Sequence, residues 1–308
     1  MRKIHQSTTL TTESGHSVDL LGQNKACPVC GSTEKRRVRY SFPPFDLVEC
    51  ALCGTLHLSP LPTVELLAKI YNNNYYKDQE LEHGYLDYTA EAVRIARTYR
   101  RRLRYVKPFL SKIIAPRVLE IGAALGFGLP VASELFGVDI RACDVSQEAV
   151  AACRGSGFRA SLADPYGICG EVESHSLDLV YAFDVMEHLP DIRRFVGWLD
   201  GVIRPGGIFF VTTPDMDHVL NRVLGSRSPS IKIPQHVTYF TSDTLSEALR
   251  PSFALRADRW DYQYVSFGML ASRVAHVMRM PPSTGNYGPT LPVPNGMRMF
   301  VFQKATNQ

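Results

Sequence analysis

The sequence predicts an α/β protein in which a doubly wound, mostly parallel sheet of seven strands carries helices on both faces. A small cysteine-bearing module precedes it. Two observations predict this architecture. From residue 113 to residue 308, apolar runs of strand length alternate with helical patterns. Ahead of that alternation stand two Cys-x-x-Cys pairs, Cys27/Cys30 and Cys50/Cys53.

Composition places the chain among ordinary globular proteins. Of its 308 residues 45% are hydrophobic and 21% charged, and the net charge of +4 does not by itself indicate nucleic acid or an anionic membrane. No apolar run approaches the roughly 20 residues of a membrane span. Residues 1–24 are polar and lack the apolar segment of a secretion signal, so we expect an irregular or disordered tail. We therefore expect a cytoplasmic monomer or homodimer.

Residues 25–62 read as a zinc ribbon. Cys27, Cys30, Cys50 and Cys53 form two knuckles, each followed by a glycine that permits a left-handed turn. Four thiolates at this spacing predict a closed, structural Zn²⁺ site. Short strands are expected at 37–40 and 47–49. The three other cysteines, at positions 143, 153 and 169, are expected to be small buried apolar residues.

Residues 63–112 are expected to form a helical linker or cap. It contains a short helix at 64–71, a polar loop at 72–76 that is either a surface loop or a flap over a ligand, and a long helix at 89–109. The long helix is basic between Arg97 and Arg104. A solvated helix face explains this more readily than a nucleic-acid patch, and we do not expect a nucleic-acid partner.

The α/β domain, 113–308, is expected to contain five strands in alternation with helices, followed by two closing strands. The strands are predicted at 117–121, 139–144, 158–161, 177–183, 208–212, 253–260 and 297–303. The helices are predicted at 127–136, 147–154, 191–202, 242–249 and 265–278. A turn is expected at 204–207. The stretches 216–235 and 281–295 are expected to be an irregular insertion and an exposed loop that shape a substrate pocket.

The turn after the first strand of this domain is the main candidate for ligand binding. It runs from Glu120 through Gly122 and Gly126 into a helix. Small residues let a ligand approach the backbone, and the helix N-terminus offers free N–H groups. Such a turn is weak evidence when it stands alone.

Together with Asp144 and the stretches 178–189 and 204–214, this turn resembles class I S-adenosylmethionine-dependent methyltransferases, which have a Rossmann-like fold. The ribbon resembles that of bacterial methyltransferases that act on sugars or natural products. The resemblance implies S-adenosylmethionine as cofactor. It places Asp144 on the ribose, Val145 against the adenine and Asp164 at the adenine edge. The implied cofactor-binding residues are Glu120, Gly122, Ala123, Ala124, Gly126, Asp144, Val145, Asp164, Phe183 and Asp184. Ala124 stands where the family often has glycine, and alanine resists a positive φ.

A second cluster follows the fourth strand, where Asp184 precedes Glu187 and His188, and His236 comes later in the chain. Three hypotheses describe the role of these residues. They are structural; or His188 or His236 is a general base; or the four hold a divalent metal, Mg²⁺ or Mn²⁺. In the metal hypothesis, the pattern of these four residues resembles that of the ubiquinone-pathway O-methyltransferases and the small-RNA 2′-O-methyltransferases, except that those families have glutamate at the position of Asp184.

The resemblance therefore implies a methyltransferase that acts on a small-molecule acceptor. We expect O-methylation of a sugar or natural-product intermediate first, and transfer to nitrogen or carbon after it. One alternative is an RNA methyltransferase that grips RNA with the ribbon and the Arg97–Arg104 helix. Another is a non-catalytic interaction module centred on the ribbon.

Overall fold

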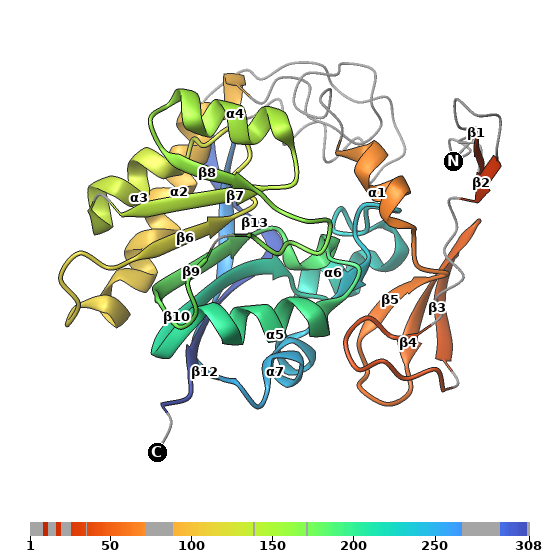
Figure 1. Ribbon diagram of the computed structural model, residues 1–308. Coiled ribbons are helices and arrows are strands. Elements are labelled where there is room, and N and C mark those ends of the chain that lie inside the picture. Colours follow the sequence, from red (N-terminus) through yellow and green to blue (C-terminus); the bar gives the residue numbers. More distant parts are fainter. Residues whose placement is uncertain are drawn as a thin grey trace.

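The centre of the protein is a seven-stranded sheet with the order β12-β13-β10-β9-β6-β7-β8 (Figure 1). The computed structural model describes residues 9–11, 17–19, 26–34, 36–71, 89–137, 139–170, 172–266 and 290–306. The parallel strands are β6 (Val118–Ile121), β7 (Ile140–Asp144), β8 (Arg159–Leu162), β9 (Leu177–Phe183) and β10 (Ile203–Pro214). Strand β13 (Thr290–Lys304) runs antiparallel to β10 and to β12 (Phe253–Ser266). The predicted fold class is confirmed.

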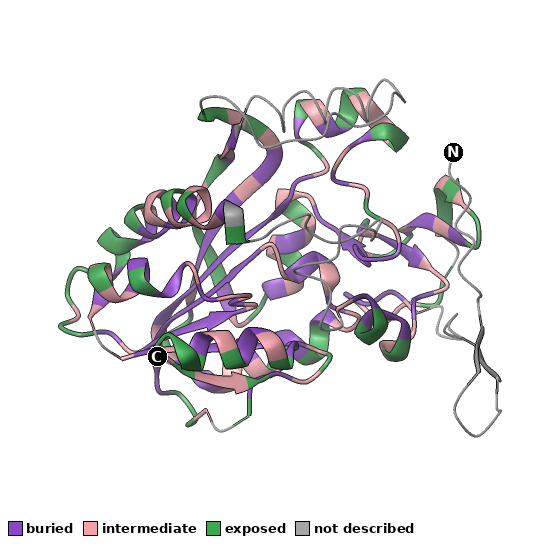
Figure 2. Cartoon of the chain, turned by 90° about the horizontal axis from the view of Figure 1, so that it is seen from above, coloured by how far each residue is buried: buried purple, intermediate pink, exposed green. Residues whose placement is uncertain are grey.

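Two apolar layers cover this sheet, because successive strand residues point to opposite faces. Val118 of β6 belongs to the layer under α2 (Ala92–Val106) and α3 (Leu129–Phe136). Leu119 belongs to the layer under α5 (Ile192–Val202) and α7 (Ser242–Leu249). Helix α4 (Gln147–Gly155) packs beside β7 and β8. The central strands are almost entirely buried (Figure 2).

Helices α4, α5 and α7 each begin at a residue whose side chain caps the helix N-terminus. Ser146 accepts a hydrogen bond from Ala149 N at the start of α4, and Asp191 accepts one from Arg194 N at the start of α5. Thr241 forms a reciprocal capping box at the start of α7. Each cap satisfies a backbone N–H that would otherwise have no partner within the helix, so these sequence positions fix where the helices begin.

The ribbon forms a second sheet of four strands in the order β11-β5-β4-β3. Strands β3 (Arg36–Phe42) and β4 (Phe45–Cys50) extend the two predicted strands. Strand β5 (Leu56–Ser59) was not predicted, and β11 (Thr238–Tyr239) comes from the distant C-terminal part. Helix α1 (Val64–Ile70), which was predicted at 64–71, follows and is capped by Thr63. The ribbon therefore shares a sheet with the α/β domain.

Several expectations for the connecting segments need correction. The stretch 216–235 is not wholly irregular, because it contains α6 (Val219–Leu224) and the 3-10 turn η4 (Gly225–Arg227). Residues 204–207 are a bulged part of β10, residues 265–266 belong to β12, and residues 290–295 belong to β13. Within the tail, β1 (Thr9–Thr11) pairs with β2 (Ser17–Asp19), where irregular chain was expected. The expected 72–76 loop and the 267–278 and 281–289 stretches lie outside the described residues.

The long basic helix is divided into the 3-10 turn η1 (Thr89–Glu91), α2 and the 3-10 turn η2 (Lys107–Leu110). No helix in the described ranges is long and apolar enough to cross a membrane. Cys143, Cys153 and Cys169 are buried, as predicted. Cys143 and Cys169 also form a disulfide between the end of β7 and the loop after β8, which the spacing did not reveal.

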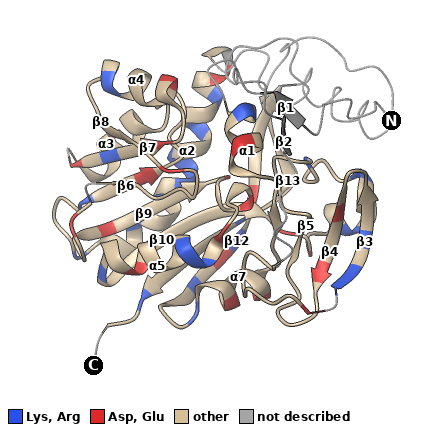
Figure 3. Ribbon diagram, turned by 45° about the vertical axis from the view of Figure 1, so that its right-hand side comes forward, with Lys and Arg blue, Asp and Glu red and all other residues tan. Residues whose placement is uncertain are grey.

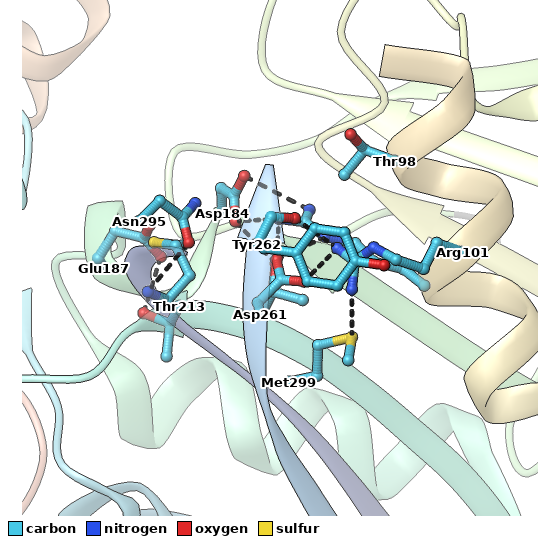
Figure 4. A network of polar contacts seen from close by, with 12 residues as sticks. Thr98, Arg101, Asp184, Glu187, Thr213, Asp261, Tyr262, Asn295 and Met299 are labelled. Atoms are coloured by element: carbon cyan, nitrogen blue, oxygen red, sulfur yellow. Dashed lines mark hydrogen bonds and ion pairs between the residues drawn. The ribbon is translucent and has the colours of Figure 1, made fainter. Parts of the chain in front are cut away.

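A buried charge network joins α2 to β12. Arg102 is 2% exposed, and its guanidinium lies 2.7 Å from a carboxylate oxygen of the fully buried Asp261. Arg101 pairs with the same carboxylate, and Figure 4 shows Arg101, Asp261 and Tyr262 brought together from the two elements. Since a buried charge is costly without a partner, this network fixes how α2 sits on the sheet.

The Asp261→Asn substitution tests this network. It keeps the shape of the side chain but removes the negative charge that faces the buried Arg102 guanidinium. We therefore expect the free energy of unfolding to fall by about 3 kcal/mol. Urea denaturation measures the change. The control is Arg100→Ala on the same helix, whose pair with Glu134 is exposed to solvent and should contribute much less to stability. Equal losses in both variants would contradict the assignment.

Candidate functional site

The turn after β6 has the left-handed backbone that a close ligand approach requires. Gly122, Ala124 and Gly126 have φ of 72°, 49° and 79°. A Cβ at Gly122 would lie 2.5 Å from Val185 Cγ2, so only glycine fits there. Ala124 adopts a positive φ despite its Cβ. Such a conformation costs a non-glycine residue on the order of 1 kcal/mol and is concentrated at functional sites.

Asp144 connects this turn to the loop after β7. Its Oδ2 accepts a hydrogen bond from Ala124 N at 2.8 Å, and its Oδ1 accepts one from Ser146 N at 2.9 Å. The carboxyl is 6% exposed, and burial raises its pKa. The next residue, Val145, is 41% exposed although it is apolar. A fixed carboxylate beside an exposed apolar side chain suits the ribose and the adenine of a nucleoside.

Glu120 and Phe183 point inward rather than toward the turn. The Glu120 carboxyl accepts a hydrogen bond from the Tyr181 hydroxyl at 2.8 Å, and burial raises its pKa to about 8. The Phe183 ring packs against Tyr99 and Phe210, with centroids 5.0 and 5.2 Å away. These two side chains support the ends of β6 and β9 from the core.

Asp164 lies after β8 at the same edge of the sheet, but its carboxylate is engaged locally. Oδ1 accepts hydrogen bonds from the backbone N–H groups of Tyr166 and Ile168, and Oδ2 accepts one from Arg194 at 2.8 Å. The residue therefore shapes its own loop.

Asp184 ends β9 with a φ of 59°, which is unusual for a residue with a side chain. Its Oδ1 accepts a hydrogen bond from the Thr212 hydroxyl at 2.7 Å, and the Arg102 guanidinium lies 3.4 Å away. Figure 4 shows Asp184 near the α2–β12 network, with Glu187 and Thr213 on its other side. Asp184 is thus held by Thr212 of β10 and by Arg102 of α2.

The structure brings Glu187, His188 and His236 together. One potential ligand atom from each lies within 4.8 Å of the others, in a group that does not include Asp184. Glu187 and His188 lie in the 3-10 turn η3 (Met186–His188), and His236 lies just before β11. The two imidazole centroids are 4.7 Å apart. Of the four residues suggested as metal ligands, three therefore meet, and Asp184 faces Arg102.

Backbone carbonyls fix both imidazoles. His188 Nδ1 lies 3.0 Å from Gln235 O, and His236 Nδ1 lies 2.8 Å from Ser230 O. A carbonyl can only accept, so the contact with Ser230 O places the proton of His236 on Nδ1 and its lone pair on Nε2. His188 Nδ1 also lies 2.7 Å from the Tyr71 hydroxyl, which can either donate or accept. Carbonyl-bonded Nδ1–H groups orient both general bases and metal ligands.

Burial sets the protonation of this cluster. It lowers the pKa of His188 to about 4 and that of His236 well below the usual range, so both imidazoles are neutral near pH 7. Burial, followed by the nearby negative charge of Asp184, raises the pKa of Glu187 to about 8. The Glu187 carboxyl also accepts a hydrogen bond from the Thr213 hydroxyl at 3.0 Å. Perturbed pKa values of this kind concentrate at functional sites.

Sequence reasoning missed two residues that support the cluster. Tyr71, at the end of α1, places its hydroxyl 2.7 Å from His188 Nδ1. The Asn221 amide donates to Asp215 O and Gly296 O, and its oxygen accepts from the Ser228 and Ser230 hydroxyls. Asn221 thereby holds the segment whose carbonyl binds His236. No sequence pattern marks either residue, because their partners are far away along the chain.

The four ribbon cysteines form a tight group. Their sulfurs lie within 4.8 Å of one another, and Cys27 Sγ is 3.6 Å from Cys53 Sγ. Gly31 N–H and Gly54 N–H donate to the carbonyls of Cys27 and Cys50, with φ of 75° and 70°. These are the knuckle turns that the sequence predicted, and four such sulfurs are compatible with tetrahedral Zn²⁺.

Four arginines of the basic run in α2 contact other residues of the protein. Arg97 lies over the Tyr264 ring, and Arg100 pairs with Glu134. Arg101 and Arg102 pair with Asp261. Basic and acidic residues also lie side by side elsewhere, as on β3 and β4 in Figure 3. The basic run therefore has a structural role in joining α2 to its neighbours.

The sheet order, the turn after β6 and Asp144 at the end of β7 define the class I S-adenosylmethionine-dependent methyltransferase fold. The family described as "Methyltransferase domain" matches residues 92–251. Because this match covers more than half of the chain, the chain belongs to that methyltransferase family. The match begins at α2, which the sequence analysis had placed in the linker.

Among curated relatives, the chain is similar to ubiquinone biosynthesis O-methyltransferases. It is 30% identical to that of Sinorhizobium fredii over 39% of this chain and 48% of the relative. It is 32% identical to that of Mesorhizobium japonicum over 39% and 47%. It is 25% identical to phosphoethanolamine N-methyltransferase 2 of Caenorhabditis elegans over 37% and 27%. The chain spans about half or less of these relatives' lengths.

Among solved structures, an S-adenosylmethionine-dependent methyltransferase from Mesorhizobium loti has a TM-score of 0.44 at 16% identity. The match covers 65% of this chain and 96% of that one. The family assignment rests on the domain match and not on this structural likeness.

The strain at Ala124 leads to a stability prediction. Ala124→Gly should raise the free energy of unfolding, by at most about 1 kcal/mol, because glycine tolerates the positive φ. The matched control is Ala123→Gly at the neighbouring buried position, which does not have a positive φ and should lose stability. Chemical denaturation measures both. A loss of stability in Ala124→Gly would show that the turn does not hold this strain.

The raised pKa of Glu187 leads to a pH prediction. The folded protein favours the protonated carboxyl, so this stabilisation is complete below about pH 4.5 and is lost as pH rises toward 8. Glu187→Gln imitates the protonated form and does not titrate. Relative to this variant, the native protein should therefore lose a few kcal/mol across that window. Denaturation at several pH values, in buffer without added Mg²⁺ or Mn²⁺, measures the difference, and a pH-independent difference would contradict the assignment.

Proposed function

We propose that this chain binds S-adenosylmethionine at the turn Gly122–Gly126 and at Asp144, and methylates a hydroxyl group of a small molecule. The observation that carries the proposal is the position of Asp144. This carboxylate holds the turn by one oxygen and the following loop by the other, beside the exposed Val145. The residues present therefore fit the cofactor, since ribose hydroxyls can donate to a fixed carboxylate.

When bound, S-adenosylmethionine supplies an electrophilic methyl group on a sulfonium. The chain's own residues then need to orient the acceptor and take a proton from it. Parallel α/β sheets bind their ligands beyond the carboxyl ends of the strands. Glu187 and His188 follow the carboxyl end of β9, and His236 lies beside them. This position supports a role for the cluster in binding the acceptor.

His236 is the residue that we assign as proton acceptor, with His188 and Glu187 beside it. Its Nδ1–H is bound to Ser230 O, so the Nε2 lone pair is the free basic position. With S-adenosylmethionine bound, the acceptor oxygen would bond to the methyl carbon as the bond from that carbon to sulfur breaks. The hydroxyl proton passes to the imidazole. The products are a methyl ether and S-adenosylhomocysteine. In-line transfer of this kind depends mainly on positioning.

The acceptor is best supported as a hydroxyl. The relatives from Sinorhizobium and Mesorhizobium are named O-methyltransferases. Within that class, we propose a sugar or natural-product hydroxyl, because the ribbon resembles that of methyltransferases acting on such compounds. An RNA acceptor is less well supported, because most of the α2 arginines are engaged with residues of the protein itself.

Two variants separate cofactor binding from turnover. Asp144→Asn places an NH₂ group against a backbone N–H, so calorimetry should show at least about tenfold weaker S-adenosylmethionine binding. His236→Asn can still donate to Ser230 O but has no basic nitrogen, so turnover should fall by about 10² to 10⁴-fold. Its cofactor affinity should stay unchanged. Turnover is measured as S-adenosylhomocysteine release with a panel of hydroxylated sugars and aromatic acceptors. Unchanged turnover in His236→Asn would contradict the proton-transfer role.

A second candidate role for the cluster is a divalent metal site. Two imidazoles and one carboxyl, which each offer a ligand atom within 4.8 Å of the others, form a possible ligand set for Mg²⁺ or Mn²⁺. Native mass spectrometry with excess Mn²⁺ tests this role. One zinc plus a second ion that is lost in His236→Asn would support it and would favour a chelating acceptor such as a vicinal diol. Zinc alone would contradict it.

A further inference from the structure

The ribbon contacts both segments that carry the catalytic histidines. Its first knuckle meets the segment of His188, because Pro28 O accepts a hydrogen bond from Ile192 N at 3.0 Å. Its strand β5 meets the segment of His236, because Leu58 N–H donates to Val237 O at 2.9 Å. The two histidines are 48 positions apart in the chain. The ribbon is one of the elements that touch both of their segments.

The second contact continues directly into the cluster. The N–H of Val237 donates to Glu187 O at 2.7 Å. The peptide groups on either side of Val237 are thus bonded to the ribbon and to η3. Beyond it, Thr238 and Tyr239 pair with His57 and Leu56 of β5. The backbone from β5 to Glu187 is a continuous set of hydrogen bonds that passes beside His236.

Side-chain packing supports the same connection. Cys27, Val29 and Cys50 belong to the apolar layer that includes Ile192 of α5 and Leu245 of α7. An ideal Cβ at Gly31 would lie 2.4 Å from the Arg193 guanidinium, so the knuckle is covered closely by α5. The cysteines therefore form part of the core of the α/β domain. A module that only bound a separate partner would not need this burial.

We propose that the ribbon is a metal-dependent clamp that positions His188 and His236 relative to one another. Binding of Zn²⁺ by Cys27, Cys30, Cys50 and Cys53 fixes the two knuckles. The first knuckle then fixes Ile192, and β5, which follows the second knuckle, fixes Val237. Through these two residues the ribbon fixes the η3 turn and the residues around His236. This proposal deepens the proposed function and rests on it. In this arrangement Pro28, Leu58 and Ile192 are positioning residues that act through their backbone.

Hydrogen exchange of the full-length protein tests the clamp without any acceptor. Removal of zinc with a chelator should speed exchange of the Ile192 and Val237 amides by about tenfold or more, because both are bonded within this path. Exchange at Leu119 of β6 should stay unchanged. If the knuckle amides of Gly31 and Gly54 speed up while Ile192 and Val237 stay protected, the proposal is overturned.

A matched pair of variants decides the question even if metal removal unfolds the protein. Ile192 is the first residue of α5, a position where proline is well tolerated. Ile192→Pro removes the N–H that Pro28 O accepts. Ile192→Ala keeps that N–H but loses a similar amount of apolar side chain. We expect zinc to pass to a chromogenic chelator about tenfold faster from Ile192→Pro than from Ile192→Ala.

Two further readouts separate this clamp from the proposed chemistry. The NMR signals of the His188 and His236 rings should shift in Ile192→Pro and stay in place in Ile192→Ala. Equal zinc release and unshifted rings would overturn the clamp and leave the proposed methyl transfer untouched. Conversely, an inactive wild-type protein with the expected exchange and release rates would count against the function and not against the clamp.

Discussion

The backbone on either side of Val237 joins two parts of the molecule that the sequence keeps apart. Its carbonyl accepts from the ribbon and its N–H donates to the turn after β9. A buried backbone group without a hydrogen-bond partner destabilises the fold, so the loss of either contact would lower the stability of the protein. The position of His236, one residue earlier, follows from these two hydrogen bonds. The ribbon and the α/β domain are therefore one structural unit at this point.

The turn after β6 likewise depends on a small number of backbone conformations and hydrogen bonds. Gly122 and Gly126 provide left-handed conformations that admit a ligand, and Asp144 accepts the N–H of Ala124 between them. Beneath the turn, Glu120 bonds to Tyr181 and keeps the strand end in place. The acid at the end of β6 is thus a support for the turn, whereas Asp144 has the exposed neighbour expected of a contact residue.

The acceptor side is shaped by buried charge. Arg102 lies between Asp184 and Asp261 and fixes α2 against the end of β9. Farther along, burial keeps His188 and His236 neutral and Glu187 easily protonated. The site therefore separates a permanently charged group, which positions helices, from a cluster in which two neutral imidazoles lie beside a carboxyl that favours its protonated form.

Sequence patterns were sufficient for the seven strands of the α/β domain and for helices α3, α4, α5 and α7, but not for α6, and they were sufficient for the cysteine knuckles and the turn at Gly122. These features depend on neighbours in the chain, on periodicity, capping and backbone freedom. The meeting of His188 with His236, the addition of β11 to the ribbon, the role of Asn221 and the burial of Arg102 were decided only by the tertiary structure. Each of these depends on which segments, distant in the sequence, pack together in the fold, and local sequence patterns do not specify that packing. Arg102 comes nearest to an exception, because it shares a helix face with the buried Tyr99, Leu103 and Val106. Its partner Asp261 nevertheless lies 159 positions away.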